Sequence, residues 1–202
     1  MTQTRRMGVE SSKVRARFVD AAEAILTEEG YHAISARYVA TRADLKTQLL
    51  YYYFRTMDDV LLEVVRRVNE RRRARFDEII AGPQPLRALW EQSRDPSSAT
   101  LAAELVSIGS HREAIRNEIV SGAEEFRKLQ IAAVERILVE RAGENGQRPV
   151  EGSAAALVML SAALGRMLVT ESAFGLTIAH EEALGLVEQA LARMGEASVD
   201  QP

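Results

Sequence analysis

Hydrophobic positions in this chain recur every three or four residues, from near its beginning to near its end. The first such segment contains Val14, Phe18, Ala21, Ala22, Ile25 and Leu26. This spacing gathers apolar side chains on one face of an α-helix. Ser11 or Ser12 can cap the start of the helix, and Gly30 can end it in a left-handed conformation. No series of segments shows the alternation with a period of two that is typical of strands. The pattern therefore predicts an all-α fold.

Short helical segments follow the first helix. The pattern predicts one helix over Ala36–Arg42, capped by Ser35, and another over about Lys46–Tyr53, with a tight turn between them. Thr56 precedes a long apolar periodicity, and Asp59 stands three residues later. This is the arrangement of a capping box, which predicts that a fourth helix starts here.

The rest of the chain is helical by the same criterion. Helices are expected over residues 86–94, 98–110, 111–142, 150–174 and about 180–194. A turn-rich break, "GENGQRP", separates the third of these from the fourth. A long helix, a short helix, a tight turn and a second short helix make a helix-turn-helix unit, whose second short helix is the one that enters a DNA major groove.

Composition narrows the class of protein. Of the 202 residues, 47% are hydrophobic and 27% are charged, which is typical of a soluble globular chain. There is no cysteine, so disulfides and thiol-ligated metals are excluded and a reducing cytosol is expected. The first seventeen residues have no apolar core, which argues against a signal peptide. The longest apolar stretch, residues 152–170, is rich in small residues and contains Arg166, which favours a buried or interface helix over a membrane span.

Charge is divided unevenly along the chain, whose overall net charge is −3. Residues 1–75 hold 15 Lys and Arg against 10 Asp and Glu, a net charge of +5, whereas residues 76–202 carry −8. A basic N-terminal part suggests an anionic partner for the first third of the chain. Chance variation of surface charge is the alternative explanation.

Residues 18–61, "FVDAAEAILTEEGYHAISARYVATRADLKTQLLYYYFRTMDDVL", resemble the N-terminal domain of TetR-type (TetR/AcrR-like) bacterial transcriptional repressors. The shared features are a helix that ends in Gly-aromatic, a second helix centred on small residues, an Ala-Gly-Val-like turn, and Leu-Tyr-aromatic-aromatic-Phe. The resemblance implies a helix-turn-helix DNA-binding domain over residues 1–56 and a larger helical domain over residues 57–202 for ligand binding and dimerisation. It also implies a cytoplasmic homodimer that joins through its last two helices, binds a palindromic operator and needs no cofactor or metal.

The resemblance also suggests which residues meet DNA. Leu50 and Phe54 share one helix face and should enter the core, so that the neighbouring tyrosines fan over the surface. A tyrosine hydroxyl can donate to a phosphate, and the Gln48 amide can pair with adenine. The candidate DNA-binding residues are Arg37, Arg42, Lys46, Thr47, Gln48, Tyr51, Tyr52, Tyr53, Arg55 and Thr56. Further phosphate contacts could come from Arg5, Arg6, Lys13, Arg15 and Arg17. The alternatives are that some tyrosine rings are buried between helices and that many of the cations are only solvated.

Three positions depart from the family pattern. Asp44 replaces a turn glycine that should need positive φ, and its carboxylate is unfavourable near DNA. Leu49 and Met57 replace a Ser/Thr and a Lys that contact phosphate in the resembled family, and Arg55 could compensate. An alternative function is therefore a TetR-like protein that has lost DNA binding and acts through protein partners.

The larger domain should hold a small-molecule effector, and its many Leu, Ala, Val and Met residues favour an apolar one. The candidate pocket residues are Trp90, Leu105, Ile108, His111, Met159, Met167 and Phe174, and ordinary core packing is the alternative for each. For the dimer, the segments 151–175 and 181–194 offer small residues and an apolar stripe of Leu184, Val187, Ala190, Leu191 and Met194. These two helices could instead form the core of a monomeric bundle.

An enzyme is the rival from another functional class. His32 follows Glu29 with the Glu-x-x-His spacing of di-iron helical bundles, but those need two such motifs and this one contains Gly30. The sequence has no glycine-rich phosphate loop and no nucleophile elbow. We therefore expect a regulator and not an enzyme.

Overall fold

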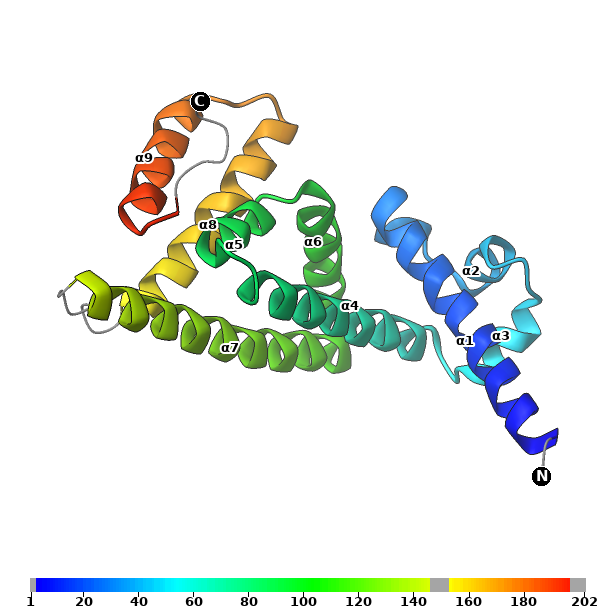
Figure 1. The fold of residues 1–202 in the computed structure, drawn as a ribbon. Helices are drawn as coiled ribbons and strands as arrows, with labels where there is room; N and C mark the ends of the chain where they lie inside the picture. Colours follow the sequence, from blue (N-terminus) through cyan, green and yellow to red (C-terminus); the bar gives the residue numbers. More distant parts are fainter. Residues whose placement is uncertain (1–2, 146–152, 197–202) are drawn as a thin grey trace. The chain divides into compact units, whose positions relative to one another are not determined.

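The computed structural model describes residues 3–145 and 153–196, with side chains described for residues 12–142 and 153–196 (Figure 1). The described residues form α-helices and one short 3₁₀ helix, with no strand among them, which confirms the all-α expectation. The helix bounds are α1 Gln3–Glu28, η1 Tyr31–Ala33, α2 Ala36–Arg42, α3 Thr47–Tyr53, α4 Met57–Ile80, α5 Pro85–Ser93, α6 Pro96–His111, α7 Glu113–Asn145, α8 Ser153–Ala173 and α9 His180–Arg193.

The predicted helices agree with the observed ones except at the start of the chain. A helix start at Ser11 or Ser12 was wrong, because α1 begins at Gln3. A serine can cap a helix, but the segment before it holds no proline, so nothing forces the helix to begin there. The end of α1 was predicted correctly. Gly30 has φ of +82°, and its backbone N–H donates to Ile25 O at 3.0 Å.

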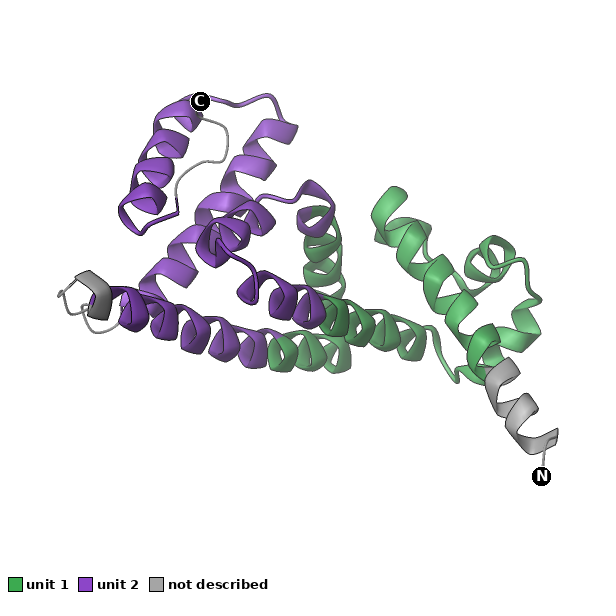
Figure 2. Cartoon of the chain, in the orientation of Figure 1, with its two compact units in different colours: residues 1–71, 100–122 green, residues 72–99, 123–202 purple. Residues whose placement is uncertain are grey.

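The chain divides into two compact units (Figure 2). The first unit contains residues 1–71 and 100–122, and the second contains residues 72–99 and 123–202. Helices α4, α6 and α7 each begin in one unit and end in the other. The functional division at residue 56, expected from the resemblance, stays a prediction.

The core of the first unit gathers around α1. Phe18, Ile25, Leu50 and Val60 are fully buried there. The rings of Phe18 and Phe54 meet edge to face, with centroids 6.4 Å apart. Leu101, Leu105, Ile108 and Ile115 of α6 and α7 belong to the same core. The expected burial of Leu50 and Phe54 is confirmed, with exposures of 0% and 2%. The two short helices are thus fixed by a core to which distant parts of the chain contribute.

The turn between α2 and α3 rests on an interaction with α1. Asp44 has φ of +52°, as its position in the turn predicted, and an Asp tolerates this region better than most residues. The Arg17 guanidinium donates to the Ala43 carbonyl oxygen at 2.6 Å and to the Asp44 carbonyl oxygen at 3.2 Å. The Asp44 carboxylate lies 3.7 Å from the same guanidinium. Arg17, expected to contact phosphate, therefore holds the turn.

A polar network within the first unit joins η1 to α4, α6 and the start of α7. The Tyr31 backbone N–H donates to Glu104 Oε2 at 2.7 Å. Arg112 forms an ion pair with Asp58 and donates to the Tyr31 hydroxyl, and its guanidinium lies 5.5 Å from the centre of the Tyr31 ring. Helices α6 and α7 are therefore tied to the helix-turn-helix by hydrogen bonds as well as by the shared core.

The second unit has its own core between α5, α7, α8 and α9. Its buried members include Trp90, Val134, Val158, Leu168 and Leu191. The apolar stripe of α9 belongs to this unit. Leu184, Val187 and Met194 pack against the core, and Leu191 is buried in it. Only Leu191 is thus fully used within its own unit, whereas Leu184, Val187 and Met194 keep part of their surface exposed, and the expectation that this stripe faces a second subunit stays a prediction.

A buried carboxylate in the second unit joins the segment after α9 to α5 and α7. Glu196 is fully buried, and its Oε1 accepts the Leu86 backbone N–H at 3.1 Å. The Arg87 backbone N–H donates to Oε2, and Arg141 Nη2 lies 2.5 Å from Oε1. Glu196 thereby satisfies two of the free N–H groups at the start of α5, which Gln84 does not cap with its side chain. The segment after α9 thus fixes the position of α5.

Replacing Leu50 by Ala should destabilise the first unit by about 2–5 kcal/mol, because it leaves a cavity in the core beneath α3. The change is measured by urea unfolding followed by far-UV circular dichroism. Leu49→Ala is the matched control, since Leu49 is the preceding residue and is 37% exposed. The Leu49→Ala variant should lower the free energy of unfolding by less than about 1 kcal/mol. Equal losses in the two variants would contradict the described packing of α3.

Candidate nucleic-acid interface and ligand cavity

The outer face of α3 carries exposed aromatic side chains. Tyr51 is 54% exposed and Tyr52 is 79% exposed, because Leu50 and Phe54 take the inner face. Tyr53 is half-buried against the core of the first unit, and its ring meets that of Tyr52 edge to face at 5.0 Å. The tyrosine run is thus divided, with Tyr51 and Tyr52 on the surface and Tyr53 supporting Tyr52.

Polar residues stand at the start of α3. Lys46 is the N-cap residue and makes no side-chain capping hydrogen bond. The Lys46 and Gln48 side chains are exposed, and Thr47 is half-buried. We call these three side chains, together with Tyr51 and Tyr52 of the same helix, the reading surface. Its hydrogen-bonding groups and its cation are of the kind that contact base edges and phosphates.

The predicted cations differ in how their charges are matched. Arg42 Nη1 lies 3.2 Å from Glu29 Oε1, and its Nη2 contacts Glu28. The hydrogen bond with Glu28 raises the pKa of the Arg42 guanidinium. Arg37, Lys46 and Arg55 are exposed and form no ion pair with any described residue. These three cations can therefore bind an anion, whereas Arg42 is already paired with two carboxylates.

The remaining expected contacts fall into two groups. Thr56 and Asp59 form the predicted capping box of α4: the Thr56 backbone N–H donates to Asp59 Oδ2 at 2.9 Å, and the Asp59 N–H to Thr56 Oγ1 at 3.2 Å. Arg15 forms an ion pair with Glu63 at 3.1 Å and lies over the Phe54 ring. Thr56 and Arg15 thus have structural partners. The side chains of Arg5 and Arg6 lie outside the described residues.

The predicted pocket residues do not come together. Leu105 and Ile108 are buried in the core of the first unit, and His111 is exposed at the end of α6. On α8 and just after it, Met159, Met167 and Phe174 are 50%, 49% and 85% exposed. Trp90 is buried in the second unit and lines its cavity, whereas the other six residues do not. Sequence spacing identifies an apolar position, but it does not tell a core side chain from a cavity wall.

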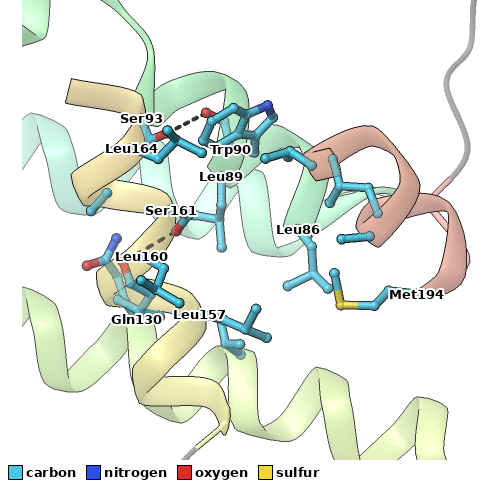
Figure 3. A pocket seen from close by; sticks show the side chains of 16 residues that line it. Leu86, Leu89, Trp90, Ser93, Gln130, Leu157, Leu160, Ser161, Leu164 and Met194 are labelled. Carbon is cyan, nitrogen blue, oxygen red and sulfur yellow. Dashed lines mark hydrogen bonds between the residues drawn. The ribbon is translucent and has the colours of Figure 1, made fainter. Parts of the chain in front are cut away.

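The cavity of the second unit has a volume of about 200 Å³ and lies between α5, α7, α8 and α9 (Figure 3). Leu86, Leu89 and Trp90 of α5 form one wall. Leu157, Leu160, Ser161 and Leu164 of α8 face them, and Met194 lies at the end of α9. Leu160 is 67% exposed, so the cavity reaches the surface at that residue. Among the described residues no group of His, Asp and Glu could hold a metal ion.

Helix α8 exposes much of its apolar surface. It is long and apolar enough to cross a membrane by length and composition, and 22% of its most apolar window is buried within this chain. Leu160 and Met167 are two helical turns apart, so they share one face, and Met159 adjoins it. Leu186 of α9 is also 67% exposed. About half or more of the surface of each of these side chains is exposed in the single chain.

Residues 18–64 match the family model described as "Bacterial regulatory proteins, tetR family". The matched segment runs from the buried Phe18 of α1 through the helix-turn-helix into α4. The comparison with curated protein sequences gives no match.

Solved structures share the fold over most of the chain. A transcriptional regulator from Saccharomonospora viridis in complex with choline aligns with a TM-score of 0.66 and 18% identity, covering 81% of this chain and 87% of that one. GusR from Salmonella enterica aligns with a TM-score of 0.65 and 17% identity, covering 89% of this chain and 95% of that one. A regulator from Rhodococcus sp. Rha1 aligns with a TM-score of 0.63 and 21% identity, covering 87% of this chain and 96% of that one. At these identities the likeness concerns the fold. The family match over residues 18–64 agrees with the expected resemblance to TetR-type regulators.

Replacing Tyr52 by Ala should weaken binding to a preferred DNA duplex by roughly 10- to 100-fold, because it removes a hydrogen bond to a charged phosphate and the packing of the ring. Tyr52→Phe keeps the ring and removes only the hydroxyl, so it should fall between Tyr52→Ala and the parent protein. Fluorescence anisotropy measures the affinity, and circular dichroism checks the fold. An unchanged affinity in folded Tyr52→Ala would remove Tyr52 from the interface.

Replacing Asp44 by Asn should tighten DNA binding by about 3- to 10-fold at low salt, because it removes an exposed negative charge beside the reading surface while Asn still tolerates positive φ. The gain should shrink as salt is added. Glu182→Gln removes an exposed carboxylate from the second unit and is the matched control. Equal gains in the two variants would indicate an effect of net charge alone.

Proposed function

We propose that this chain, a TetR-type DNA-binding transcriptional regulator, is a homodimeric repressor that a small apolar molecule releases from a palindromic operator. The observation that carries the DNA-binding part is the exposed face of α3, where Tyr52 is 79% exposed in a helix whose other face is buried. A soluble chain gains nothing in stability from an aromatic side chain held in water, so a partner is expected to cover it.

The reading surface fits a DNA major groove. The Gln48 amide can pair with a base edge, and the tyrosine hydroxyls of α3 can donate to phosphate oxygens. Arg37, Lys46 and Arg55 supply positive charge that no described carboxylate neutralises. We assign base reading to Gln48 and phosphate binding to the three cations. Thr47, Tyr51 and Tyr52 complete the proposed contacts.

A second subunit would cover the exposed apolar face of α8. Met159, Leu160 and Met167 lie on that face, and Leu186 on α9 offers further apolar surface. A two-fold axis through such a face gives an isologous dimer, and two reading surfaces related by that axis match a palindrome. The proposed dimer still joins through α8 and α9, as expected from the sequence. Its contacts are the exposed residues of these helices and not the stripe of α9 that packs on its own unit. It also accounts for the apolar character of α8 in a soluble, cytoplasmic protein.

The cavity of the second unit is the proposed effector site. Its walls come from α5, α7, α8 and α9, and α7 continues into the first unit. Residues 113–122 of α7, with residues 100–111 of α6, belong to the unit that carries the reading surface, where Arg112 and Glu104 hold Tyr31. A ligand that shifts α7 can therefore bias the helix-turn-helix through these contacts.

Purified protein should bind a labelled duplex from upstream of its own gene tightly and selectively in fluorescence anisotropy, beside a scrambled duplex of the same composition. Three free cations in each of two subunits predict that the logarithm of the binding constant falls with the logarithm of salt concentration with a slope of about −5. Arg55→Gln and Arg37→Gln should each flatten this slope.

Weak binding of both duplexes, with no sequence enriched from genomic fragments, would contradict the repressor. It would favour a TetR-like protein that acts through protein partners, for which the exposed carboxylate of Asp44 and the neutralised Arg42 already provide a physical reason.

A further inference from the structure

None of the described residues that line the effector cavity has an ionisable side chain. Of its sixteen lining residues, thirteen are apolar, and the other three are Ser93, Gln130 and Ser161 (Figure 3). A charged ligand that enters such a cavity leaves water and finds no opposite charge, which is strongly unfavourable. The lining therefore selects for a neutral molecule.

The polar groups indicate what a neutral ligand should carry. Ser93 Oγ donates to the Trp90 carbonyl oxygen at 2.7 Å, and Ser161 Oγ donates to the Val158 carbonyl oxygen at 3.3 Å. Each hydroxyl has used its hydrogen within its own helix, so it offers lone pairs to the cavity. Gly165 on α8 allows Ser93 to come close, because a Cβ at residue 165 would overlap Ser93 Oγ. The matching ligand group is a hydrogen-bond donor, such as a hydroxyl.

A cationic ligand meets a further obstacle at Trp90. The Arg94 guanidinium lies 5.5 Å from the centre of the Trp90 ring, which is a cation–π distance. Trp90 is the only aromatic side chain among the described residues that line the cavity, and a second cation on it would be repelled by Arg94. The choline seen in the Saccharomonospora viridis structure is therefore a poor guide to the ligand of this chain.

The volume limits the size of the ligand. The cavity of about 200 Å³ is somewhat larger than the engineered cavity of roughly 150 Å³ that binds benzene. A single ring with one small substituent fits this space, whereas a drug-sized molecule requires a larger pocket.

We infer that the effector is a neutral, single-ring alcohol or phenol that binds between α5 and α8. The ring packs on Trp90 and the leucines, and its hydroxyl donates to Ser93 or Ser161. This inference rests on the proposed effector site and adds the chemical class of the ligand. It also predicts that the protein discriminates by charge among molecules of the same shape.

Trp90 supplies the test, because it is the only tryptophan of the chain and it lines the cavity. Titration of the full-length protein with benzyl alcohol should change the intrinsic fluorescence saturably. Benzoate and benzylammonium have nearly the same shape but are charged at neutral pH, and they should bind about 100-fold more weakly. Equal binding of the three probes, or no saturable response to benzyl alcohol, would overturn the inference.

Ala162→Phe is the blocking variant, because Ala162 lines the cavity and the added ring occupies the proposed site. Ala132→Phe is the matched control on an exposed position of α7 that does not line it. Benzyl alcohol binding should fall at least about tenfold in the first variant and stay unchanged in the second. Retained binding in Ala162→Phe would place the ligand elsewhere.

A phenylalanine at this position can also disturb packing, so the double variant Ser93→Ala, Ser161→Ala provides a milder second test. Without the two hydroxyls, the protein should lose its preference for benzyl alcohol over toluene.

The DNA assay separates this inference from the proposed function. Selective DNA binding with no benzyl alcohol response would overturn the ligand class and leave the regulator in place. A saturable, charge-selective response without DNA binding would support the cavity assignment and contradict the repressor. Release of bound duplex by benzyl alcohol, but not by benzoate, would support both.

Discussion

The packing of Leu50 and Phe54 against α1 is the constraint on which the interface depends. Both side chains are almost completely buried, and Phe54 meets Phe18 edge to face. Since they are four residues apart, their burial fixes the rotation of α3 about its axis and leaves Tyr51 and Tyr52 on the outer face. A helix of seven residues is too short to be stable alone, so this orientation comes from tertiary packing. The exposed tyrosines are therefore a consequence of the core.

The features that follow from local rules could be predicted from the sequence. Ser35 caps α2, Thr56 and Asp59 form the capping box of α4, Gly30 ends α1, and Asp44 takes positive φ. Each of these depends on a residue and its near neighbours along the chain. The resemblance of residues 18–61 added the arrangement of the helices, which the family match confirms over residues 18–64.

Features that depend on distant partners could not be predicted in this way. Nothing in the local sequence pairs Arg42 with Glu28 and Glu29, or directs Arg17 to the turn. The burial of Glu196 depends on α5, which is more than one hundred residues away in the chain. Apolar residues posed the same difficulty, because a leucine in a core, in a cavity wall or on an uncovered face has the same helical spacing. For this reason Leu105 and Ile108 were expected in a pocket but lie in the core of the first unit.

The two units therefore suggest a division of tasks that their chemistry supports. The first combines a buried core with exposed polar and aromatic side chains on α3, and the second combines a cavity whose described lining is uncharged with a partly exposed apolar helix. The most direct test of the account is a selection of duplexes from a random library by the full-length protein, followed by sequencing. A two-fold dimer should enrich an inverted repeat whose half-sites are separated by about one or two helical turns, roughly 34–70 Å. Sequences that remain random after repeated rounds would contradict this assignment, because they would mean that the exposed side chains of α3 do not read bases.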